Sequence, residues 1–273
     1  MPHARINGID IYFERHGEAG EPLVLIHGYT GDISDWRFQI EAFAQTNRVL
    51  VLDNRGHGRS EAPKDRASYT IEQMAFDAEA LAIEVGFERY HLAGHSMGGA
   101  IAQEIALASP GRLLSLTLED TAYSFDLSRN EMITKLAAIR RKIAEQQGMA
   151  AVAAIPSPFP LPPHMPKERE GETRERMERM SVDGYIGAQE GLNAWPGTVD
   201  RLASIVAPTL VVYGEFDFFL LIQAAKRMAK LIPGAVLESI PEAGHSPQYE
   251  RPELFNAALR QHLDRVAAGM SAK

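Results

Sequence analysis

The chain has 273 residues, with 28 lysines and arginines, 36 aspartates and glutamates, and no cysteine. Its length fits one large domain or two small ones, and a hydrophobic fraction of 45% excludes a mostly disordered chain. The absence of cysteine excludes disulfide scaffolds, thiolate metal sites and cysteine nucleophiles. The net charge of −8 argues against nucleic acid as a partner, because binding to phosphate backbones requires a basic surface.

The start of the sequence contains no apolar stretch of signal-peptide length, and no window approaches 18 uncharged apolar residues. We therefore expect a cytoplasmic protein that does not span or bind a membrane. A homodimer is compatible with this composition.

The first predicted element is a β-hairpin over residues 5–16. Asn7-Gly8 is a strong two-residue turn signal, and apolar residues alternate with polar ones after it. Farther along the chain, short apolar runs are typical of parallel strands that are buried on both faces. These predicted strands cover residues 23–26, 48–52, 90–93, 113–118, 209–213 and 236–240.

Helical patterns lie between the predicted strands. Thr70 and Glu72 mark one helix start, and Pro252 marks another. The predicted helices cover residues 35–45, 70–85, 97–108, 218–231 and 252–266. Strands that alternate with helices at this spacing predict an α/β fold with a mainly parallel, doubly wound sheet.

One connection, between the strands that end at residue 118 and begin at residue 209, is too long for an ordinary loop. We interpret residues 121–202 as an inserted helical cap on a core formed by residues 1–120 and 203–273. The predicted parts of this cap are a helix over 128–147, a proline-rich irregular crossing over 156–166 and a charged, solvated helix over 167–180.

The candidate nucleophile is Ser96, in the G-x-S-x-G sequence Gly94-His95-Ser96-Met97-Gly98. This pentapeptide follows a predicted strand and precedes a predicted helix, which is the setting of a nucleophile elbow. The glycines relieve crowding at the sharp turn, and the helix N-terminus favours developing negative charge.

A serine hydroxyl needs a positioned base, and His245 is the best candidate among nine histidines. It follows the predicted strand 236–240 and a short turn, so it lies where ligand sites gather in open α/β sheets. We interpret His27 and His57, which lie in Gly-rich turns, as residues that order their loops.

An acid must hold the tautomer of the base. Asp217 follows the predicted strand 209–213 and gives the chain order Ser, Asp, His that is typical of this arrangement. Asp120 is the alternative acid, because it ends the strand after the nucleophile helix. Glu119 is less favoured, since it should point to the opposite side of that strand.

Acyl transfer also needs hydrogen-bond donors for the oxyanion. We expect the backbone N–H of Met97 and that of Tyr29, in the loop over residues 27–31, to provide them. Gly28 allows this loop to approach the site closely. The Tyr29 phenol is also a candidate to bond the substrate.

These motifs together resemble the α/β-hydrolase fold superfamily, and the chain resembles its capped serine hydrolases of the esterase and lactonase type. The matching segments are His27-Gly28, the run from Asp53 to Ser60, Gly94 to Gly99, Gly214 to Asp217, and Gly244-His245. The resemblance implies cleavage of an ester or lactone through an acyl-enzyme formed by Ser96, His245 and Asp217, without cofactor or metal.

The same resemblance makes two groups of family reactions less favoured for this chain. Epoxide hydrolases and haloalkane dehalogenases of this family use an aspartate at the elbow, where this chain has Ser96. Carbon–carbon bond hydrolases of ring-cleavage products often have a tryptophan after the catalytic histidine, where this chain has Ser246. Such a hydrolase, or a ligand receptor of the same fold, remains an alternative.

Apolar side chains are candidates to line the substrate pocket and suggest a hydrophobic group in the substrate. They are Trp36, Phe125, Phe159, Trp195, Phe218, Phe219 and Leu220, each of which is equally compatible with plain core. The basic residues Arg140, Arg141 and Lys167 are compatible with binding a carboxylate and, more simply, with solvated surface.

Overall fold

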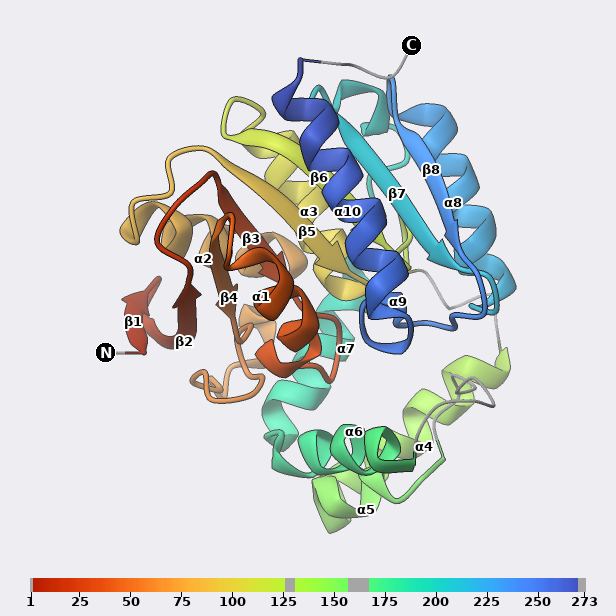
Figure 1. Ribbon diagram of the computed structural model, residues 1–273. Coiled ribbons are helices and arrows are strands. Elements are labelled where there is room, and N and C mark those ends of the chain that lie inside the picture. Colours follow the sequence, from red (N-terminus) through yellow and green to blue (C-terminus); the bar gives the residue numbers. More distant parts are fainter. Residues whose placement is uncertain (1, 126–130, 157–166, 270–273) are drawn as a thin grey trace.

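The computed structural model describes residues 2–125, 131–156 and 167–269, and its strands form one eight-stranded sheet in the order β1-β2-β4-β3-β5-β6-β7-β8. Strand β2 runs antiparallel to both neighbours, and the pairs from β4 to β8 are parallel (Figure 1). The strands are β1 (His3–Ile6), β2 (Ile9–His16), β3 (Pro22–Ile26), β4 (Arg48–Leu52), β5 (Tyr90–His95), β6 (Leu113–Glu119), β7 (Thr209–Gly214) and β8 (Val236–Ile240). The predicted α/β class with a mainly parallel sheet is confirmed.

The predicted hairpin is formed by β1 and β2. Its two turn residues, Asn7 and Gly8, have φ angles of 46° and 82°, and Ile6 pairs with Ile9 across the turn. Positive φ at both central residues gives the turn a twist that matches the flanking strands, which is why Asn-Gly is favoured there.

The sheet is covered by helices on both faces, and the side chains of β3 show why. Leu23 and Leu25 pack into the cluster beneath α1 (Arg37–Phe43) and α10 (Pro252–Ala267), whereas Val24 and Ile26 pack into the cluster on the opposite face. That opposite face is covered by α2 (Ile71–Glu84), α3 (Met97–Ala108) and α8 (Phe219–Leu231) (Figure 1). Because successive side chains of a strand alternate between faces, a strand buried on both must be apolar throughout.

Strand β8 differs from this expectation. It lies at the edge of the sheet and pairs only with β7. Leu237 and Ser239 are exposed, whereas Ile240 is buried. The prediction that this run is buried on both faces is therefore wrong, because an edge strand with one partner keeps part of its surface in solvent.

The predicted core helices are present with small differences at their ends. The predicted helix 35–45 begins as a 3-10 turn, η1 (Ile33–Trp36), before α1. Three short or glycine-rich helices and two 3-10 turns were not predicted from the sequence. These are α5 (Met149–Ala153), α7 (Val182–Ala194), α9 (Pro247–Glu250), η2 (Arg66–Ser68) and η3 (Leu202–Ser204).

Between β6 and β7 the structure contains α4 (Glu131–Gln147), α5, α6 (Lys167–Arg179) and α7, here called the inserted helices. Figure 1 shows α4, α5 and α6 beyond the carboxyl ends of the strands, with α7 between them and the sheet. The start of the predicted helix 128–147 and almost all of the predicted crossing 156–166 lie outside the described residues. The boundaries proposed for a cap over 121–202 stay a prediction.

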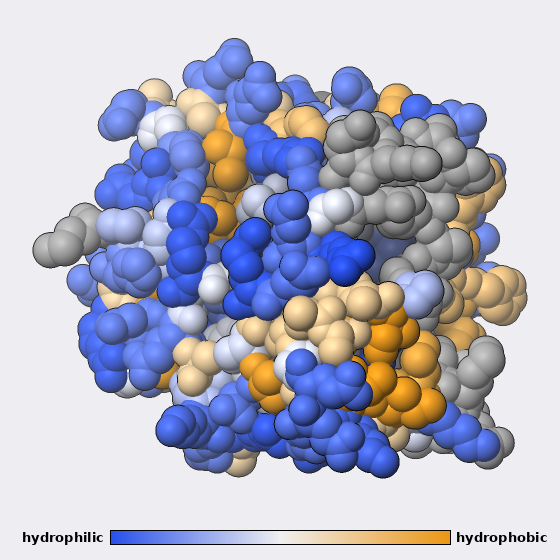
Figure 2. Space-filling view, turned by 90° about the horizontal axis from the view of Figure 1, so that it is seen from below, coloured by the Kyte–Doolittle hydropathy of each residue, from blue (hydrophilic) through white to orange (hydrophobic). Residues whose placement is uncertain are grey.

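The face that carries the inserted helices is mainly hydrophilic, with apolar residues gathered mostly in one area (Figure 2). None of the helices in the described ranges combines the length and the apolar character needed to cross a bilayer. The charged helix α6 contributes to this polar surface, as predicted, with an Arg174–Glu178 pair one turn apart.

Candidate active site

Ser96 lies on a strained turn between β5 and α3. Its φ and ψ angles are 52° and −114°, a region that residues other than glycine rarely adopt. The turn is fixed by two hydrogen bonds: the Ser96 N–H donates to Glu119 O at 2.9 Å, and Thr121 Oγ1 donates to Ser96 O at 2.7 Å. A Cβ at Gly94 would overlap the carbonyl of Gly98, so only glycine permits this close approach.

The hydroxyl of Ser96 meets the imidazole of His245. His245 Nε2 lies 3.1 Å from Ser96 Oγ, and His245 Nδ1 lies 3.0 Å from Asp217 Oδ1. A carboxylate can only accept, so Nδ1 donates to Asp217 and Nε2 accepts from the serine hydroxyl. The three residues follow the carboxyl ends of β5, β7 and β8, which are far apart in sequence and lie in the same half of the sheet, with β6 between β5 and β7.

The carboxylate of Asp217 is fully buried and ionised. Burial by itself would raise its pKa, but the neighbouring His245, a hydrogen bond from Asp120 and the N–H of Phe218 at 2.7 Å hold the pKa below its ordinary value. A charged Asp217 therefore stabilises the imidazolium that forms when His245 takes a proton.

The structure also places the alternative acid, Asp120, beside Asp217. Asp120 Oδ1 accepts from the Gly214 N–H at 2.9 Å, and its backbone has a positive φ of 39°. Burial and the charge of Asp217 raise the pKa of Asp120 well above its ordinary value. Asp217 thus accepts from His245, and the raised pKa of Asp120 favours its protonated form, which is able to donate to Asp217.

Asp120, Asp217 and His245 also form a group with the composition of a metal site, since each offers one ligand atom within 4.8 Å of the others. These three residues fit a metal ion poorly, for two reasons. Metal ligands must be deprotonated, whereas burial favours the neutral form of Asp120. In addition, His245 Nδ1 is already hydrogen-bonded to Asp217.

The loop after β3 packs directly against Ser96. A Cβ on Gly28 would lie 3.1 Å from Ser96 Cβ. His27 Nε2 accepts from the Asn54 N–H at 2.9 Å, so its Nδ1 carries the proton and donates to Gly28 O at 2.8 Å. This bond explains the loop-ordering role expected for His27.

The same bonds orient the next peptide. Gly28 O also accepts from the Gly31 N–H at 3.1 Å, and because the peptide is trans, the Tyr29 N–H points away from both donors. In the described part of the chain, no hydrogen bond is made by the N–H of Tyr29 or by that of Met97. Both groups are free to donate to a ligand.

The Tyr29 phenol is engaged elsewhere. Its hydroxyl donates to Tyr185 O in α7 at 2.9 Å, and the two rings stack with centroids 5.3 Å apart. The expectation that this phenol bonds the substrate is corrected: it joins the loop after β3 to the inserted helices.

The predicted pocket residues do not form one surface. Trp36 is fully buried against Phe255 of α10, with ring centroids 6.1 Å apart, so its assignment to the pocket is corrected to core. Phe125 and Trp195 pack on each other at 6.2 Å. Phe218 is half-buried, Phe219 and Leu220 are exposed at the start of α8, and Phe159 lies outside the described residues.

Two supports of His245 were missed by the sequence analysis. Glu250, at the end of α9, accepts from the Gly244 N–H and, at 3.1 Å, from the Ser246 N–H, the two amides that flank His245. His95 Nε2 donates to His245 O at 2.6 Å. The signal for Glu250 was present, since Pro247 after Ser246 marks the start of a short helix.

Side chains of α6 attach the inserted helices to this edge of the sheet. Arg176 is mostly buried and pairs with Asp35 of η1. Glu172 accepts from Arg37 at 2.8 Å and from the hydroxyl of Tyr249 in α9. The prediction that the charged residues of α6 are solvated is therefore wrong for Arg176.

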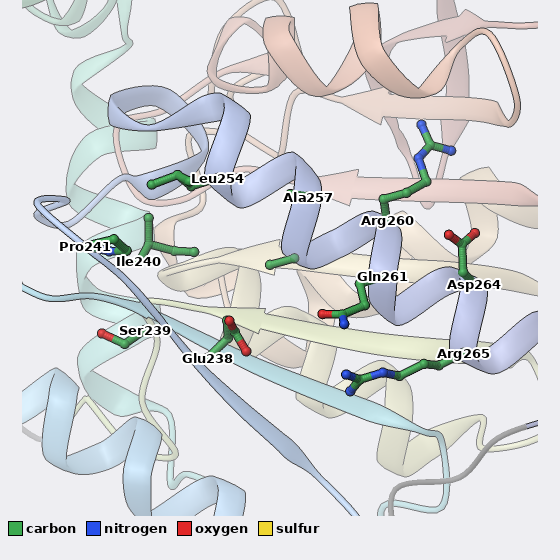
Figure 3. Close-up of a pocket in the computed structure, with 11 residues that line it drawn as sticks. Glu238, Ser239, Ile240, Pro241, Leu254, Ala257, Arg260, Gln261, Asp264 and Arg265 are labelled. Atoms are coloured by element: carbon green, nitrogen blue, oxygen red, sulfur yellow. The ribbon is translucent and has the colours of Figure 1, made fainter.

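A groove of about 800 Å³ lies elsewhere, between β8 and α10 (Figure 3). Its lining combines apolar side chains such as Leu254 with charged ones such as Glu238 and Arg265. None of Ser96, Asp217 and His245 lines it, so it is separate from the candidate active site.

Comparisons with known proteins identify a family and several relatives. A sequence model of the alpha/beta hydrolase fold matches residues 21–252. RutD of Azorhizobium caulinodans, provisionally named a carbamate hydrolase, is 32% identical over 265 residues, which are 95% of this chain and 97% of RutD.

Two solved structures are similar over almost the whole chain. The enol-lactonase from Burkholderia xenovorans LB400 is 28% identical with a TM-score of 0.85, over 96% of this chain and 100% of that one. A thermophilic esterase from Thermogutta terrifontis, with malate bound, is 29% identical with a TM-score of 0.86, over 97% and 99%.

Proposed function

Because the chain belongs to the alpha/beta hydrolase fold family, we propose that it cleaves a carboxylic ester or a lactone that carries a hydrophobic group, with Ser96 as nucleophile. The observation that carries the proposal is the hydrogen-bonded series from Ser96 Oγ through His245 to Asp217. Similar chains named as an esterase and an enol-lactonase support this choice of substrate class.

The first half of the reaction forms an acyl-enzyme. Ser96 Oγ attacks the carbonyl carbon while its proton passes to His245 Nε2, and the carbonyl oxygen becomes an oxyanion. The N–H groups of Tyr29 and Met97 donate to that oxyanion. When the intermediate collapses, the carbon–oxygen bond to the alcohol breaks and His245 returns the proton to the leaving oxygen.

The second half releases the acid. Water gives a proton to His245 Nε2 and attacks the acyl carbon, and collapse of this second intermediate breaks the bond to Ser96 Oγ, which takes the proton back. With a lactone the alcohol stays attached to the acyl group, so the product is one hydroxy acid. Asp217 stays ionised throughout and stabilises the imidazolium.

A carbamate is a second candidate substrate, favoured by the name of RutD. The same relay would attack its carbonyl, and His245 would protonate the leaving nitrogen. The carbon–carbon bond hydrolase and the ligand receptor stay as alternatives, and none of the contacts described above favours either of them.

The test combines labelling with turnover. A fluorophosphonate should add one label per chain, on Ser96, and 4-nitrophenyl esters and simple lactones should be hydrolysed with sustained turnover. Labelling of another residue would disprove the assignment. A single burst of 4-nitrophenol without steady release would indicate a ligand receptor, and faster cleavage of a carbamate than of its matched ester would favour the second candidate.

A further inference from the structure

Arg140 of α4 is a basic residue that the inserted helices hide from solvent. Its exposed fraction is 8%, whereas the side chain of its neighbour Arg141 is 42% exposed. Arg141 pairs with Glu145 and Glu190, as expected for a residue on the outer face of a helix. The two adjacent arginines therefore differ in burial: Arg140 is buried, and Arg141 lies on the surface.

The contacts of Arg140 are unusual for a buried cation. One terminal nitrogen donates to the carbonyls of Pro156 at 2.6 Å and Ile155 at 3.4 Å, and the buried Nε has no hydrogen-bond partner. Within the described residues, no carboxylate forms an ion pair with Arg140. Two neutral carbonyls position the guanidinium without neutralising it.

Such an arrangement favours a bound anion. Removing a charge from water is costly unless the charge is paired, and a guanidinium matches a carboxylate through two parallel N–H···O bonds. The buried Nε supplies a donor that is already desolvated. An anionic ligand would therefore gain more from Arg140 than from an exposed arginine.

The position of Arg140 connects it to the candidate active site. Ile143 and Ala144, one helical turn later on the same face of α4, pack in the apolar cluster that includes Tyr185 and contacts Tyr29. Although burial raises the pKa of the Tyr29 phenol, the nearby guanidinium of Arg140 opposes that rise. Tyr29 in turn follows Gly28, which packs against Ser96.

Resting on the proposed function, we propose that Arg140 binds a carboxylate group of the substrate, so that the natural substrate is an anionic ester or lactone. The hydrophobic part of the substrate then lies between the carboxylate and the carbonyl that Ser96 attacks. Arg140 acts on substrate selection, whereas the acyl transfer itself needs only the relay and the oxyanion donors.

The test compares esters that differ only in a terminal carboxylate. Mono-4-nitrophenyl esters of succinic, glutaric and adipic acid are paired with 4-nitrophenyl butanoate, pentanoate and hexanoate, which carry a methyl group instead. The wild-type kcat/KM should favour the anionic member of at least one pair by about 10- to 100-fold, the usual value of a charged hydrogen bond. The preferred chain length reports the distance from Arg140 to Ser96.

Three variants identify the residue responsible. Arg140→Gln should remove the preference and leave kcat/KM for the neutral esters nearly unchanged, and Arg140→Lys should restore part of it. Arg141→Gln is the matched control and should keep the full preference. Because the ratio within a pair is measured on one protein sample, partial misfolding of a variant cancels.

Several results would overturn the proposal. Equal kcat/KM for both members of every pair in the wild type, or an equal loss for both in Arg140→Gln, would reduce Arg140 to a structural residue. If Ser96 is labelled by a fluorophosphonate in either case, the proposed function survives and only the anionic substrate is wrong. If Ser96 is not labelled and no ester is cleaved, both fail together.

Discussion

The loops that follow β3, β5, β7 and β8, here called the strand-end loops, meet the inserted helices at the candidate site, yet the two regions are held by different contacts. In the strand-end loops the backbone fixes the reacting groups: the Ser96 N–H donates to Glu119 O, and the Phe216 N–H donates to Ala243 O at 2.8 Å. Such bonds depend little on which side chains are present.

The inserted helices attach mainly through side chains. Arg66 reaches Asp183 of α7 at 3.0 Å, and Arg176 of α6 pairs with Asp35. These contacts can change with the sequence while the strand-end loops keep their geometry. From this difference in contacts we infer that the strand-end loops carry the acyl transfer and that the inserted helices select the substrate. This assignment is called the division of labour below, and the following variants test it.

The largest effect should come from removing the nucleophile. Ser96→Ala should lower kcat by about 10⁴- to 10⁶-fold without loss of folding, because the relay has no hydroxyl to activate. The measurement is steady-state hydrolysis of a 4-nitrophenyl ester, with circular dichroism to confirm the fold. Ser204→Ala, a change at an exposed residue of η3, is the control. Turnover equal to that of the control would exclude Ser96 from the chemistry.

The second-largest loss of activity should come from changing Asp217, the acid that bonds His245. Asp217→Asn should keep the fold and lower kcat by about 10⁴-fold, because an amide can donate to His245 Nδ1 and hold the imidazole in the wrong tautomer. Kinetics at neutral pH on purified protein check this expectation. Full activity in Asp217→Asn would show that another acid supports His245.

The sequence was sufficient to place the candidate relay because each member follows the end of a predicted strand. The sequence favoured Asp217 as the acid but kept Asp120 as an alternative, since the two residues follow neighbouring parallel strands, β7 and β6, and their side chains end within reach of one histidine. Only the geometry distinguishes the carboxyl that bonds His245 from the one that bonds its partner.

Helix α7 shows why parts of the fold escape the sequence. Gly184, Gly187 and Gly191 weaken its helical pattern, because glycine costs about 1 kcal/mol per position in a helix. Each of these glycines packs closely against the core, where a Cβ would overlap Gly56 or Tyr69. The helix therefore forms because of tertiary packing, which local propensity does not record.

Trp36 illustrates the same limit for the site. A tryptophan near the start of a predicted helix is as suitable for a pocket as for a core, and only the neighbouring Phe255, more than two hundred positions later, decides for the core. Arg140 is the converse case: solvated surface was the simpler interpretation of its sequence, whereas in the structure it is buried and bonds the carbonyl of Pro156.

Breaking the attachment of the inserted helices should affect stability more than chemistry. Arg176→Met leaves Asp35 buried without its partner, which should lower the free energy of unfolding by about 3–5 kcal/mol. The value of kcat should change only a few-fold, because the strand-end loops keep the relay. Chemical denaturation and steady-state kinetics on the same variant separate the two quantities.

Two further variants sharpen that result. Arg174→Gln removes a surface pair within α6, so its cost should be about 0–1 kcal/mol. Replacing both partners, Arg176→Met with Asp35→Leu, should recover much of the loss. A collapse of kcat in Arg176→Met comparable to that in Ser96→Ala would contradict the division of labour.

Asp120→Asn should have a smaller effect on activity, less than about tenfold in kcat. If Asp120 is a neutral acid, an asparagine can still accept from the Gly214 N–H through its oxygen and donate to Asp217 through its NH₂ group. Asp120→Leu, which does neither, should lose more. An Asp120→Asn variant as impaired as Asp217→Asn would mean that the charge of Asp120, and not its proton, is needed.

A chelator provides the matching test for the group Asp120, Asp217 and His245. Hydrolysis should be unchanged after treatment with EDTA, because the relay uses these three residues for hydrogen bonds. Activity that is lost in EDTA and restored by zinc would instead assign the group to a metal.

The smallest effect on activity is expected from His262, which is buried in α10 away from the site. Burial lowers the pKa of His262 to about 4, whereas an unfolded histidine titrates at 6.5. Below pH 6.5 the unfolded chain therefore binds a proton that the folded chain refuses, so this contribution to stability is lost as the pH falls from 6.5 towards 4. At pH 5 the loss from this residue should be about 2 kcal/mol.

Other buried groups have pKa values that are shifted in either direction. The pH dependence of the stability of the wild type therefore does not isolate the contribution of His262. Burial lowers the pKa of His57 to about 3, which adds to the acid sensitivity, and raises the pKa of Asp53 to about 6, which opposes it. The decisive quantity is the difference between wild type and His262→Phe in the stability lost from pH 7.5 to pH 5. The variant should lose about 2 kcal/mol less, with kcat at neutral pH unchanged; equal losses would show that His262 is protonated in the folded chain at pH 5.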